Sequence, residues 1–411
     1  MNGINPDGLQ SIGGKPNGTK PLSIKYHSLT GRITLQVMYD AFRSVRKNRG
    51  AAGVDRQSIR MFEANLEQNL IALMKDLKTG TLQPYPARRT YIDKEPGKKR
   101  PLGIPCVRDR VAQEVLRRLL TPLFETLFHD QSYGFRPHRS CHDALRKVDE
   151  LHKAGYSHVL DADIKGFFDN IPHDVIMTGL SNVVADGNIL NLVERFLSAG
   201  VMEDGIKYPT TVGTPQGGVL SPLLANIALN FLDWQLHDAG FRFVRYADDF
   251  VVLCRTKHQA EEARTLVERA VTELGLTLSA EKTHVTKFLE GFAFLGFVRG
   301  TLWVHRARRR RPKSVEKYKN RIRELTIRSR NLDAEAVSRI NAVIRGVARY
   351  FATTFSTVTK QFENLDYWTR KRLRCMKLKR ISRVDNQRLK NKHLHRLGLV
   401  SLSDYLPCSS E

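Results

Sequence analysis

The sequence predicts an α+β fold, and three patterns support this prediction. Apolar and β-branched residues flank the adjacent pair Asp248 and Asp249, which is typical of a β-hairpin with the two aspartates at its tip. Other stretches repeat apolar residues at helical spacing, most clearly residues 259–274, and Gly275 is the expected end of that helix. Residues 306–396 are helical in pattern and carry 28 Lys and Arg against 7 Asp and Glu.

Length and charge restrict the class of protein. At 411 residues the chain can hold two or three domains, and its hydrophobic content of 41% is normal for a globular protein. No run of 18 apolar residues is present, so we expect no membrane partner. The net charge is +25, and its concentration in residues 306–396 is typical of a nucleic-acid-binding surface. A solvated helix face is the plainer interpretation, but such faces usually carry both signs.

The N-terminus and the cysteines indicate the compartment. Residues 1–21 are rich in Gly, Asn and Pro and lack an apolar run, so we expect a disordered segment at 1–30 rather than a signal peptide. The five cysteines are scattered and form no C-x-x-C pair, which favours a reducing compartment without structural zinc. These features predict a cytoplasmic protein.

The other helices and strands follow from the same spacing rules. Expected helices cover residues 35–45, 58–78, 108–127, 176–197 with a break near Gly187, and 220–236. Expected strands cover 87–92 and 100–104, joined by a turn at 95–97, then 159–164 and a hairpin within 292–303. Two amphipathic stretches in the basic region predict a helical bundle, one on Val337, Ile340, Ile344, Val347 and Phe351, the other on Phe362, Leu365, Trp368 and Leu373.

A third aspartate completes a candidate metal site. Adjacent carboxylates repel each other, and a divalent cation is the simplest way to keep both ionised. Asp163 stands at the end of the expected strand 159–164, from where it could meet Asp248 and Asp249 on a neighbouring strand. Asp161 shares that face but lies further into the strand, and Asp169 lies beyond it. In a basic protein, a metal held by carboxylates indicates a phosphate ligand.

Residues 213–222, with the sequence GTPQGGVLSP, form a glycine-rich element. Its glycines let the backbone approach a flat ligand, and Gln216 offers both a donor and an acceptor. No Gly-Lys-Ser/Thr follows, so this is not a phosphate-binding P-loop. A tight turn into the helix 220–236, with Ser221 as its cap and Pro222 at its first position, is the plainer interpretation.

Taken in order, these elements resemble the motifs of the group II intron-encoded reverse transcriptase and maturase family. RGAAGVD at 49–55 is similar to the N-terminal extension motif, and KRPLGIP at 99–105 and SYGFRP at 132–137 are similar to the fingers motifs. YADD at 246–249 is similar to the catalytic hairpin, LSAEKT at 278–283 to the motif that follows it, and FLGF at 294–297 to the primer grip. Residues 368–379 resemble the end of the thumb, or X domain, which is used in intron RNA binding. The resemblance covers residues 35–405.

The resemblance implies a right-hand polymerase with fingers, a palm built on an antiparallel sheet, and a helical thumb. It places the N-terminal extension and fingers at 31–160, the palm with its primer grip at 161–305, a fingers insertion near 175–215, the thumb or X domain at 306–400 and a tail at 401–411. The implied activity is RNA-directed DNA polymerase, which copies RNA into cDNA by two-metal nucleotidyl transfer, together with intron RNA binding in splicing and mobility. The implied partners are template RNA, intron RNA, a DNA primer or target and dNTPs. The sequence does not indicate the oligomeric state.

The resemblance also implies roles for individual residues. Two Mg²⁺ ions, for which Mn²⁺ can substitute, are held by Asp163, Asp248, Asp249 and the carbonyl of Ile164. Nucleotide contacts are implied for Lys94, Arg100, Phe168, Gln216 and Lys282. Phe168 is implied as a steric gate against a ribose 2′-hydroxyl, whereas we expect Phe167 to be core. The primer grip comprises Phe294, Leu295, Gly296 and Phe297. RNA contacts are implied for Arg308, Arg309, Arg310, Arg370, Arg372, Lys377 and Lys379.

The sequence departs from the family pattern at two points and leaves two alternative functions to consider. Arg56 follows the N-terminal motif at a position where many relatives have Gly. The last part of the chain has only Cys375 and Cys408 in place of the paired cysteines and histidines of relatives with a DNA endonuclease, so we expect no endonuclease activity. A maturase that only binds and folds intron RNA is one alternative, and the intact aspartates argue against it. A host-adapted relative in anti-phage defence, repair or CRISPR adaptation is the other, and the sequence does not separate it from an intron-encoded enzyme.

Overall fold

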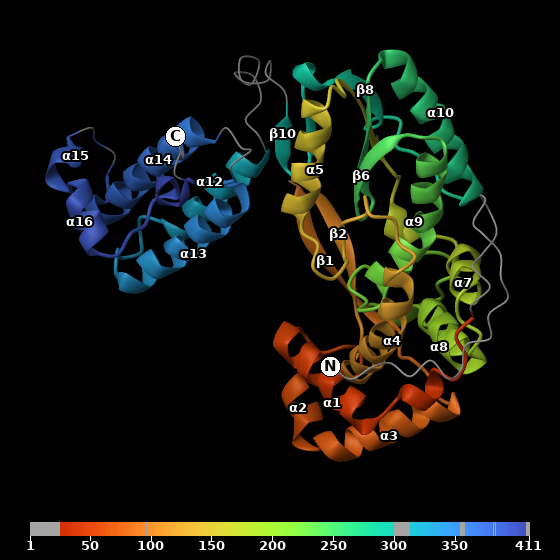
Figure 1. The fold of residues 1–411 in the computed structure, drawn as a ribbon. Helices are drawn as coiled ribbons and strands as arrows, with labels where there is room; N and C mark the ends of the chain where they lie inside the picture. The colour runs from red at the N-terminus through yellow and green to blue at the C-terminus, as the bar shows by residue number, and fades with distance from the viewer. Residues whose placement is uncertain are drawn as a thin grey trace, which may run out of the picture. The chain divides into compact units, whose positions relative to one another are not determined.

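The computed structural model describes residues 25–95, 97–299, 313–353, 358–380, 382 and 384–407 (Figure 1). The chain divides into two compact units, Met1–Lys287 and Phe288–Glu411. The first unit combines helices with sheets that are mostly antiparallel, and the second is mainly helical. The predicted α+β class is therefore confirmed. None of the described helices is both long and apolar enough to cross a membrane.

The first unit contains a central four-stranded sheet in the order β6-β7-β3-β8, in which every neighbouring pair is antiparallel. Its strands are β3 (His158–Asp163), β6 (Arg242–Tyr246), β7 (Asp249–Cys254) and β8 (His284–Lys287). Figure 1 shows helices flanking this sheet, and the ones that contact it are α5 (Cys141–Lys153), α9 (Ser221–Asp238) and α10 (Lys257–Glu273). The strands predicted at 159–164 and around the paired aspartates are present.

The two faces of the central sheet differ, because side chains along a strand alternate between faces. Leu160 and Phe250 belong to the main apolar core of the first unit. Asp161, Asp163 and Asp249 occupy the alternate positions of the same strands, so they lie on the opposite face. The sheet therefore carries an apolar face for packing and an acidic edge on its other face.

A second sheet lies in the N-terminal half and follows the order β2-β1-β4-β5. It joins β1 (Ala87–Glu95), β2 (Lys98–Ile104), β4 (Val201–Glu203) and β5 (Ile206–Tyr208). Strand β1 pairs with β4 in parallel, which brings residues near 200 to the hairpin formed near 90. The expected insertion at 175–215 thus contributes strands to the sheet that the earlier fingers-like motif begins.

Helices cover the rest of the first unit. They are α1 (Leu35–Asn48), α2 (Ile59–Ala64), α3 (Leu66–Thr79), α4 (Val107–Glu125), the short α6 (Phe167–Asn170), α7 (His173–Ser181) and α8 (Gly187–Ser198). The single helix expected at 58–78 is wrong in one respect, because Asn65 leaves the helical conformation and separates α2 from α3. The break expected near Gly187 is confirmed, since the Asp186 side chain caps the start of α8.

The N-terminal prediction needs a correction where the structure describes the chain. Tyr26 pairs with the backbone of residues 183–185, and Leu29 is fully buried in the core. Thr30 donates both its N–H and its hydroxyl to Asp186. Residues 25–30 are therefore packed against the first unit rather than disordered, while residues 1–24 lie outside the described part.

The second unit contains a short hairpin and a helical bundle. Its elements are β9 (Phe292–Phe294), β10 (Phe297–Arg299), α12 (Lys313–Leu325), α13 (Ala334–Phe351), α14 (Thr359–Leu378), α15 (Asp385–Arg388) and α16 (Asn391–Arg396). Both predicted apolar stripes contribute to its core, with Ile340, Ile344, Phe362 and Leu373 almost fully buried. The predicted helical bundle is confirmed.

The hairpin expected in 292–303 is present within its described residues, and it belongs to the second unit. Phe297 packs against Phe351 with their ring centroids 4.9 Å apart, and the Tyr350 hydroxyl donates to the carbonyl of Leu295 at 2.8 Å. The boundary between the units thus precedes this hairpin, whereas the sequence placed the hairpin with the palm. The tail expected from 401 is also packed, because Leu402 is fully buried and its N–H donates to Asp366.

Candidate active site

The register of the central sheet brings the predicted aspartates together. Asp163, the last residue of β3, stands directly opposite Asp249, the first residue of β7. Residues opposite each other in a sheet project from the same face. Asp248 precedes Asp249 in the turn of the β6–β7 hairpin, and Asp163 and Asp248 line one cavity. Asp163 and the adjacent pair Asp248 and Asp249, which is 85 positions further along the chain, therefore lie at one edge of the sheet.

The turn that carries Asp248 is tight. Tyr246 pairs with Asp249, so only Ala247 and Asp248 connect the two strands. Ala247 has a φ of 59°, a left-handed conformation that two-residue hairpins require and that residues other than glycine adopt rarely. Such a conformation persists only where the surrounding structure holds it.

A buried arginine stabilises this turn by a hydrogen bond to its backbone. Arg245 is fully buried, and its guanidinium donates to the Ala247 carbonyl at 2.9 Å and to the side chain of Asn226 at 2.9 Å. Its Nε donates to Asp233, also fully buried, at 2.7 Å. A buried charge pair is stable only when its remaining donors and acceptors are satisfied. Here the arginine's donors connect α9 directly to the backbone of the acidic hairpin.

Gly134 packs against the backbone of the same turn. A Cβ on Gly134 would lie 2.3 Å from the backbone nitrogen of Ala247, so only glycine fits this contact. The Gly134 carbonyl accepts from Asn226 at 2.9 Å, and the neighbouring Tyr133 N–H donates to the Arg245 carbonyl at 2.8 Å. The SYGFRP motif thus positions the hairpin through its backbone.

The acidic edge has cations beside it. The Lys282 ammonium lies 2.8 Å from Asp163, and the His284 ring lies 3.8 Å from Asp161. Burial raises the pKa of Asp248, and the charge of Asp163 adds to this rise, whereas Arg100 and Lys282 oppose it. Burial also raises the pKa of Asp161 to about 6. The edge therefore attracts positive charge, and a lysine supplies part of it.

The donor set fits a hard divalent cation in its chemistry, but the side chains are not gathered into a finished metal cluster. Within the described ranges, no three His, Cys, Asp or Glu side chains are arranged to hold a metal ion. Asp163 is instead engaged with Lys282. Carboxylate and carbonyl oxygens are the ligands that Mg²⁺ prefers, and it usually takes its remaining ligands from water and substrate phosphates.

A cavity of about 530 Å³ opens beside these residues. Its lining combines acidic, cationic, aromatic and amide groups, including Arg100, Phe135, Asp163, Phe168, Gln216, Asp248 and Lys282. The Phe168 ring is half-buried and meets the exposed Phe135 edge to face at 6.3 Å, whereas Phe167 is 2% exposed. The prediction that Phe167 is core is confirmed, and Phe168 is placed where it can contact a ligand.

The glycine-rich element forms another wall of the cavity. Gly217 packs on the Gly103 carbonyl so closely that a Cβ would lie 2.6 Å from it. The Gln113 side chain accepts from the N–H groups of Val219 and Leu220 and so holds the start of α9. Gln216 donates from its side chain to Asp169 at 3.1 Å. The segment is therefore a rigid loop whose glutamine is oriented at the cavity.

The RGAAGVD loop is held by arginines that donate to its carbonyls. Arg110 donates to Arg49 and Ala51, and Arg88 donates twice to Ala52. Arg56, which follows the loop, has a φ of 57°. Glycine adopts this left-handed conformation without strain, so an arginine at this position adds a local strain that the surrounding loop must hold.

The structure locates the other predicted residues as follows. Lys94 lies in β1, but its side chain is outside the described part, as are residues 308–310. Arg372 donates to the side chain and carbonyl of Thr326, and Lys379 donates to the carbonyls of Arg328 and Arg330. Lys377 is exposed, and Arg370 lines a separate cavity. The primer grip residues lie in the second unit, as described above.

Sequence reasoning missed the residues that support the site, namely Gly134, Phe135, Asn226, Asp233 and Arg245. A signal for two of them was present. Asn226 and Asp233 are seven residues apart, which places them on one face of a mostly apolar helix. A buried polar side chain requires a partner, and Arg245, a charge inside an apolar strand, was the available one.

Comparisons with known proteins agree with this geometry. Residues 92–298 match the family described as reverse transcriptase (RNA-dependent DNA polymerase), and residues 315–398 match the group II intron, maturase-specific domain. Protein YkfC of Escherichia coli (strain K12) is 36% identical over 299 residues, which cover 62% of this chain and 78% of YkfC.

Two further relatives are encoded in introns or lie within them. The group II intron-encoded protein LtrA of Lactococcus lactis subsp. cremoris is 42% identical over 201 residues, covering 48% of this chain and 33% of LtrA. An uncharacterized 91 kDa protein in the cob intron of Schizosaccharomyces pombe (strain 972 / ATCC 24843) is 44% identical over 285 residues, covering 54% of this chain and 35% of that protein. The chain thus spans only a part of these two longer relatives. On these matches, the chain belongs to the reverse transcriptases, the RNA-dependent DNA polymerases, of the group II intron-encoded type with a maturase-specific domain.

Proposed function

We propose that this chain is an active RNA-directed DNA polymerase in which Asp163, Asp248 and Asp249 hold two Mg²⁺ ions, with Mn²⁺ as a substitute. The observation that supports this most is the direct pairing of Asp163 with Asp249 beside a cavity that Asp248 also lines. When bound, the ions would activate a primer 3′-hydroxyl and neutralise charge on the leaving pyrophosphate. A protein that only binds RNA gains nothing from carboxylates that face an anionic ligand.

The carbonyl of Ile164 is suited to assist these carboxylates. Ile164 pairs with Leu278 in an antiparallel bridge, and the bonds of this bridge use the Asp163 carbonyl and the Lys165 N–H. A pair flanked in this way does not exchange its own hydrogen bonds. The Ile164 carbonyl is therefore outside the pairing, next to Asp163.

The remaining lining residues fit an incoming dNTP. Arg100 and Lys282 place positive charge beside the aspartates, where a triphosphate needs it. Phe168 and Phe135 form an aromatic wall that suits a deoxyribose and excludes an added hydroxyl. Gln216, oriented by Asp169, supports the nucleotide and its template base. Lys94 remains a proposed triphosphate contact on the grounds of the family resemblance.

For the second unit we propose binding of intron RNA that assists splicing and mobility. The maturase-specific match and the 28 Lys and Arg of residues 306–396 support this role. A polyanion is the partner that such a one-signed surface requires. Template RNA and a DNA primer would complete the substrates of the first unit.

Primer extension tests the proposed polymerase directly. The full-length chain should extend a DNA primer on an RNA template with four dNTPs and Mg²⁺, and EDTA should stop the reaction. Asp163→Asn should be inactive, whereas Asp174→Asn, which removes an exposed carboxylate outside the cavity, should act like the unchanged protein. Equal extension by Asp163→Asn and Asp174→Asn would refute the assigned site.

A further inference from the structure

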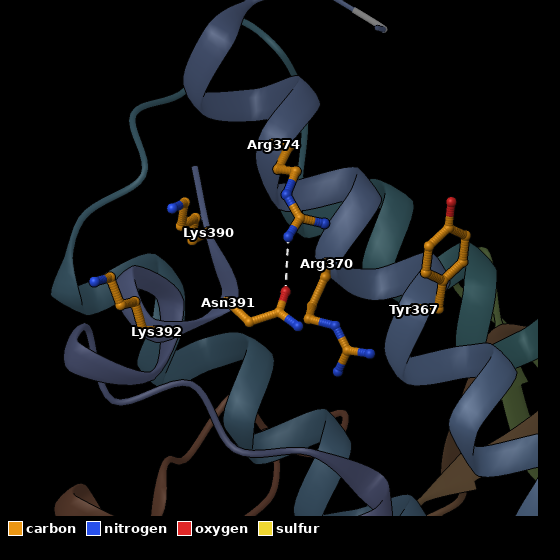
Figure 2. A pocket seen from close by; sticks show the side chains of 6 residues that line it. All are labelled: Tyr367, Arg370, Arg374, Lys390, Asn391 and Lys392. Atoms are coloured by element: carbon orange, nitrogen blue, oxygen red, sulfur yellow. Dashed lines mark hydrogen bonds between the residues drawn. The ribbon is translucent and has the colours of Figure 1, made fainter. Parts of the chain in front are cut away.

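A second cavity, in the second unit, is lined mainly by cationic side chains. Its volume is about 470 Å³, and its lining consists of Tyr367, Arg370, Arg374, Lys390, Asn391 and Lys392 (Figure 2). No carboxylate is among the described residues that line it. The volume is in the range of pockets that hold small molecules or single nucleotides, about 300–1,000 Å³. Four positive charges around one hollow require an anionic ligand.

Two segments of the chain supply these residues and are tied together. Tyr367, Arg370 and Arg374 are spaced at i, i+3 and i+7 on α14, so they share one face of that helix. Arg374 donates to the carbonyl of Leu389 at 2.9 Å and to the side-chain oxygen of Asn391 at 2.7 Å. Figure 2 shows this second bond and shows Lys390 and Lys392 across the hollow from Tyr367. The cavity is therefore built by specific contacts rather than by mobile surface lysines alone.

The charge of Arg374 is incompletely balanced. The residue is 5% exposed, and it donates hydrogen bonds to a carbonyl and to an amide oxygen. Burial lowers the pKa of Arg374, and the neighbouring Arg370 lowers it further, whereas Tyr367 and Asp385 oppose this fall. An anion in the cavity would add a negative charge that favours the charged form of Arg374. A guanidinium group can donate two parallel hydrogen bonds to two oxygens of one phosphate, which makes phosphate the best match.

Tyr367 distinguishes a nucleotide from a bare phosphate. Tyr367 is 55% exposed at the rim of the cavity, so more than half of its surface is open to a ligand. Exposed aromatic rings next to cations are the platforms on which proteins stack unpaired bases. The amide nitrogen of Asn391 is turned into the hollow in Figure 2, because the amide oxygen accepts from Arg374. The cavity therefore offers a ring for the base, cations for the phosphate and an amide for the polar edge of the base.

We propose that this cavity captures one unpaired nucleotide of a structured RNA, with the phosphate on Arg370, Arg374 and Lys390 and the base stacked on Tyr367. The inference rests on the proposed RNA binding by the second unit and names the feature of the RNA that is recognised. Bases in a continuous A-form helix are stacked on each other, so they cannot reach the Tyr367 ring. The cavity therefore selects a bulge or loop over a duplex.

The test compares two RNA hairpins that differ by one bulged adenosine. Fluorescence anisotropy measures the affinity of the full-length chain for each hairpin over a range of salt concentrations. The unchanged protein should prefer the bulged hairpin. Tyr367→Ala should reduce this preference by about tenfold, the scale of one base–aromatic stack, and Tyr367→Phe should retain it because the ring remains.

A second pair of variants tests the phosphate contact. Arg370→Gln should weaken binding of the bulged hairpin and reduce the slope of log affinity against log salt by about 0.7–0.9, as expected for one lost phosphate contact. Arg345→Gln, the same change at an exposed position of α13 outside the cavity, should affect both hairpins equally.

The outcomes separate this inference from the proposed function. If the unchanged protein binds both hairpins with equal affinity, or if Tyr367→Ala keeps the preference, nucleotide capture is refuted while RNA binding stands. If the protein binds neither hairpin, the proposed RNA binding fails as well. If Arg370→Gln loses affinity for polyglutamate but for neither hairpin, the occupant is an acidic peptide and the inference is overturned.

Discussion

Arginine serves opposite purposes in the two units. Arg245 of the first unit is fully buried, and Asp233, Asn226 and the Ala247 carbonyl accept from its guanidinium. Arg374 of the second unit is almost as buried, but a carbonyl and an amide are its hydrogen-bond acceptors, and three more cations line the same cavity. In the first unit the charge of Arg245 is neutralised internally and holds a turn, and in the second, we propose, the charge of Arg374 serves an outside ligand.

This difference follows from what each unit has to attract. An acidic edge that binds metal must keep its carboxylates in place against their mutual repulsion, so it needs internal support that does not compete for the metal. Arg245 meets this need because it contacts the backbone of the turn and not the carboxylates of the edge. A surface that binds a polyanion gains from cations without internal partners.

The largest expected effect is at the acidic edge. Asp248→Ala should lower primer extension on an RNA template by at least about 10³-fold, because metal-assisted charge stabilisation contributes several kcal/mol. Binding of structured RNA, which we assign to the second unit, should be unchanged. Near-normal extension by this variant would show that Asp248 has no role in holding the metal. Loss of RNA binding would contradict our assignment of RNA binding to the second unit alone.

The buried pair offers the next test. Asp233→Ala should reduce the free energy of unfolding by about 3–5 kcal/mol, because Arg245 keeps its charge without its carboxylate partner. The double change Asp233→Leu with Arg245→Met should recover most of this stability, since apolar replacement of a buried pair is often neutral. Urea denaturation measures both.

Activity of the same double variant separates positioning from stability. The loss of the Arg245 bond to the Ala247 carbonyl should leave primer extension low even where stability has recovered. The ratio of kcat to KM should fall mainly through kcat, since the turn carries Asp248 rather than a substrate contact. Full activity in the stable double variant would show that Arg245 has no positioning role.

Salt should distinguish the two units. Affinity for structured RNA should fall about a hundredfold between 50 and 200 mM salt if about four to five phosphates are contacted. Thermal unfolding of the first unit should respond much less, because its central ion pair is buried and poorly screened. A flat salt response of RNA binding would contradict the cationic surface of the second unit.

A buried carboxylate in the first unit predicts a pH effect. Burial raises the pKa of Asp109 to about 6, with Arg108 and the Tyr85 N–H opposing the rise. The unfolded carboxyl titrates near 3.8, so the folded chain binds the extra proton between about pH 4 and 6. The contribution of Asp109 to stability should therefore improve as pH falls from 7 to 5, by about 1 kcal/mol, which is part of the roughly 3 kcal/mol that the whole shift represents. Asp109→Asn, measured by urea denaturation at both pH values, should lack this change.

The smallest effect concerns sugar selection. Phe168→Ala should raise incorporation of rNTPs relative to dNTPs by about tenfold, the scale of one hydrophobic contact in a binding pocket. Phe167→Ala should instead lower stability by about 3–5 kcal/mol without changing the preference, because Phe167 is core. Unchanged discrimination in Phe168→Ala would return Phe168 to a packing role.

The sequence predicted the acidic edge better than its support. Alternating apolar residues around Asp163 and Asp249 are local signals, and strand pairing then brings them together with little freedom. The contacts of Gly134 with Asn226 and Ala247 join segments more than 90 residues apart, and no local pattern encodes such contacts. Arg245 bonds to Asn226 and Asp233 of the preceding helix, and spacing rules alone do not show that these three side chains meet. For the same reason the packed residues 25–30 were missed, since their contacts with residues 183–186 overrode local composition.

The central claim is that Asp163, Asp248 and Asp249 together bind paired divalent ions. Electron paramagnetic resonance can count Mn²⁺ bound to the full-length chain with an RNA template, an annealed DNA primer and an incoming nucleotide that cannot react. We expect two ions on the unchanged protein and the loss of at least one in Asp249→Asn. The same count and affinity after replacing all three aspartates with asparagine would contradict the claim.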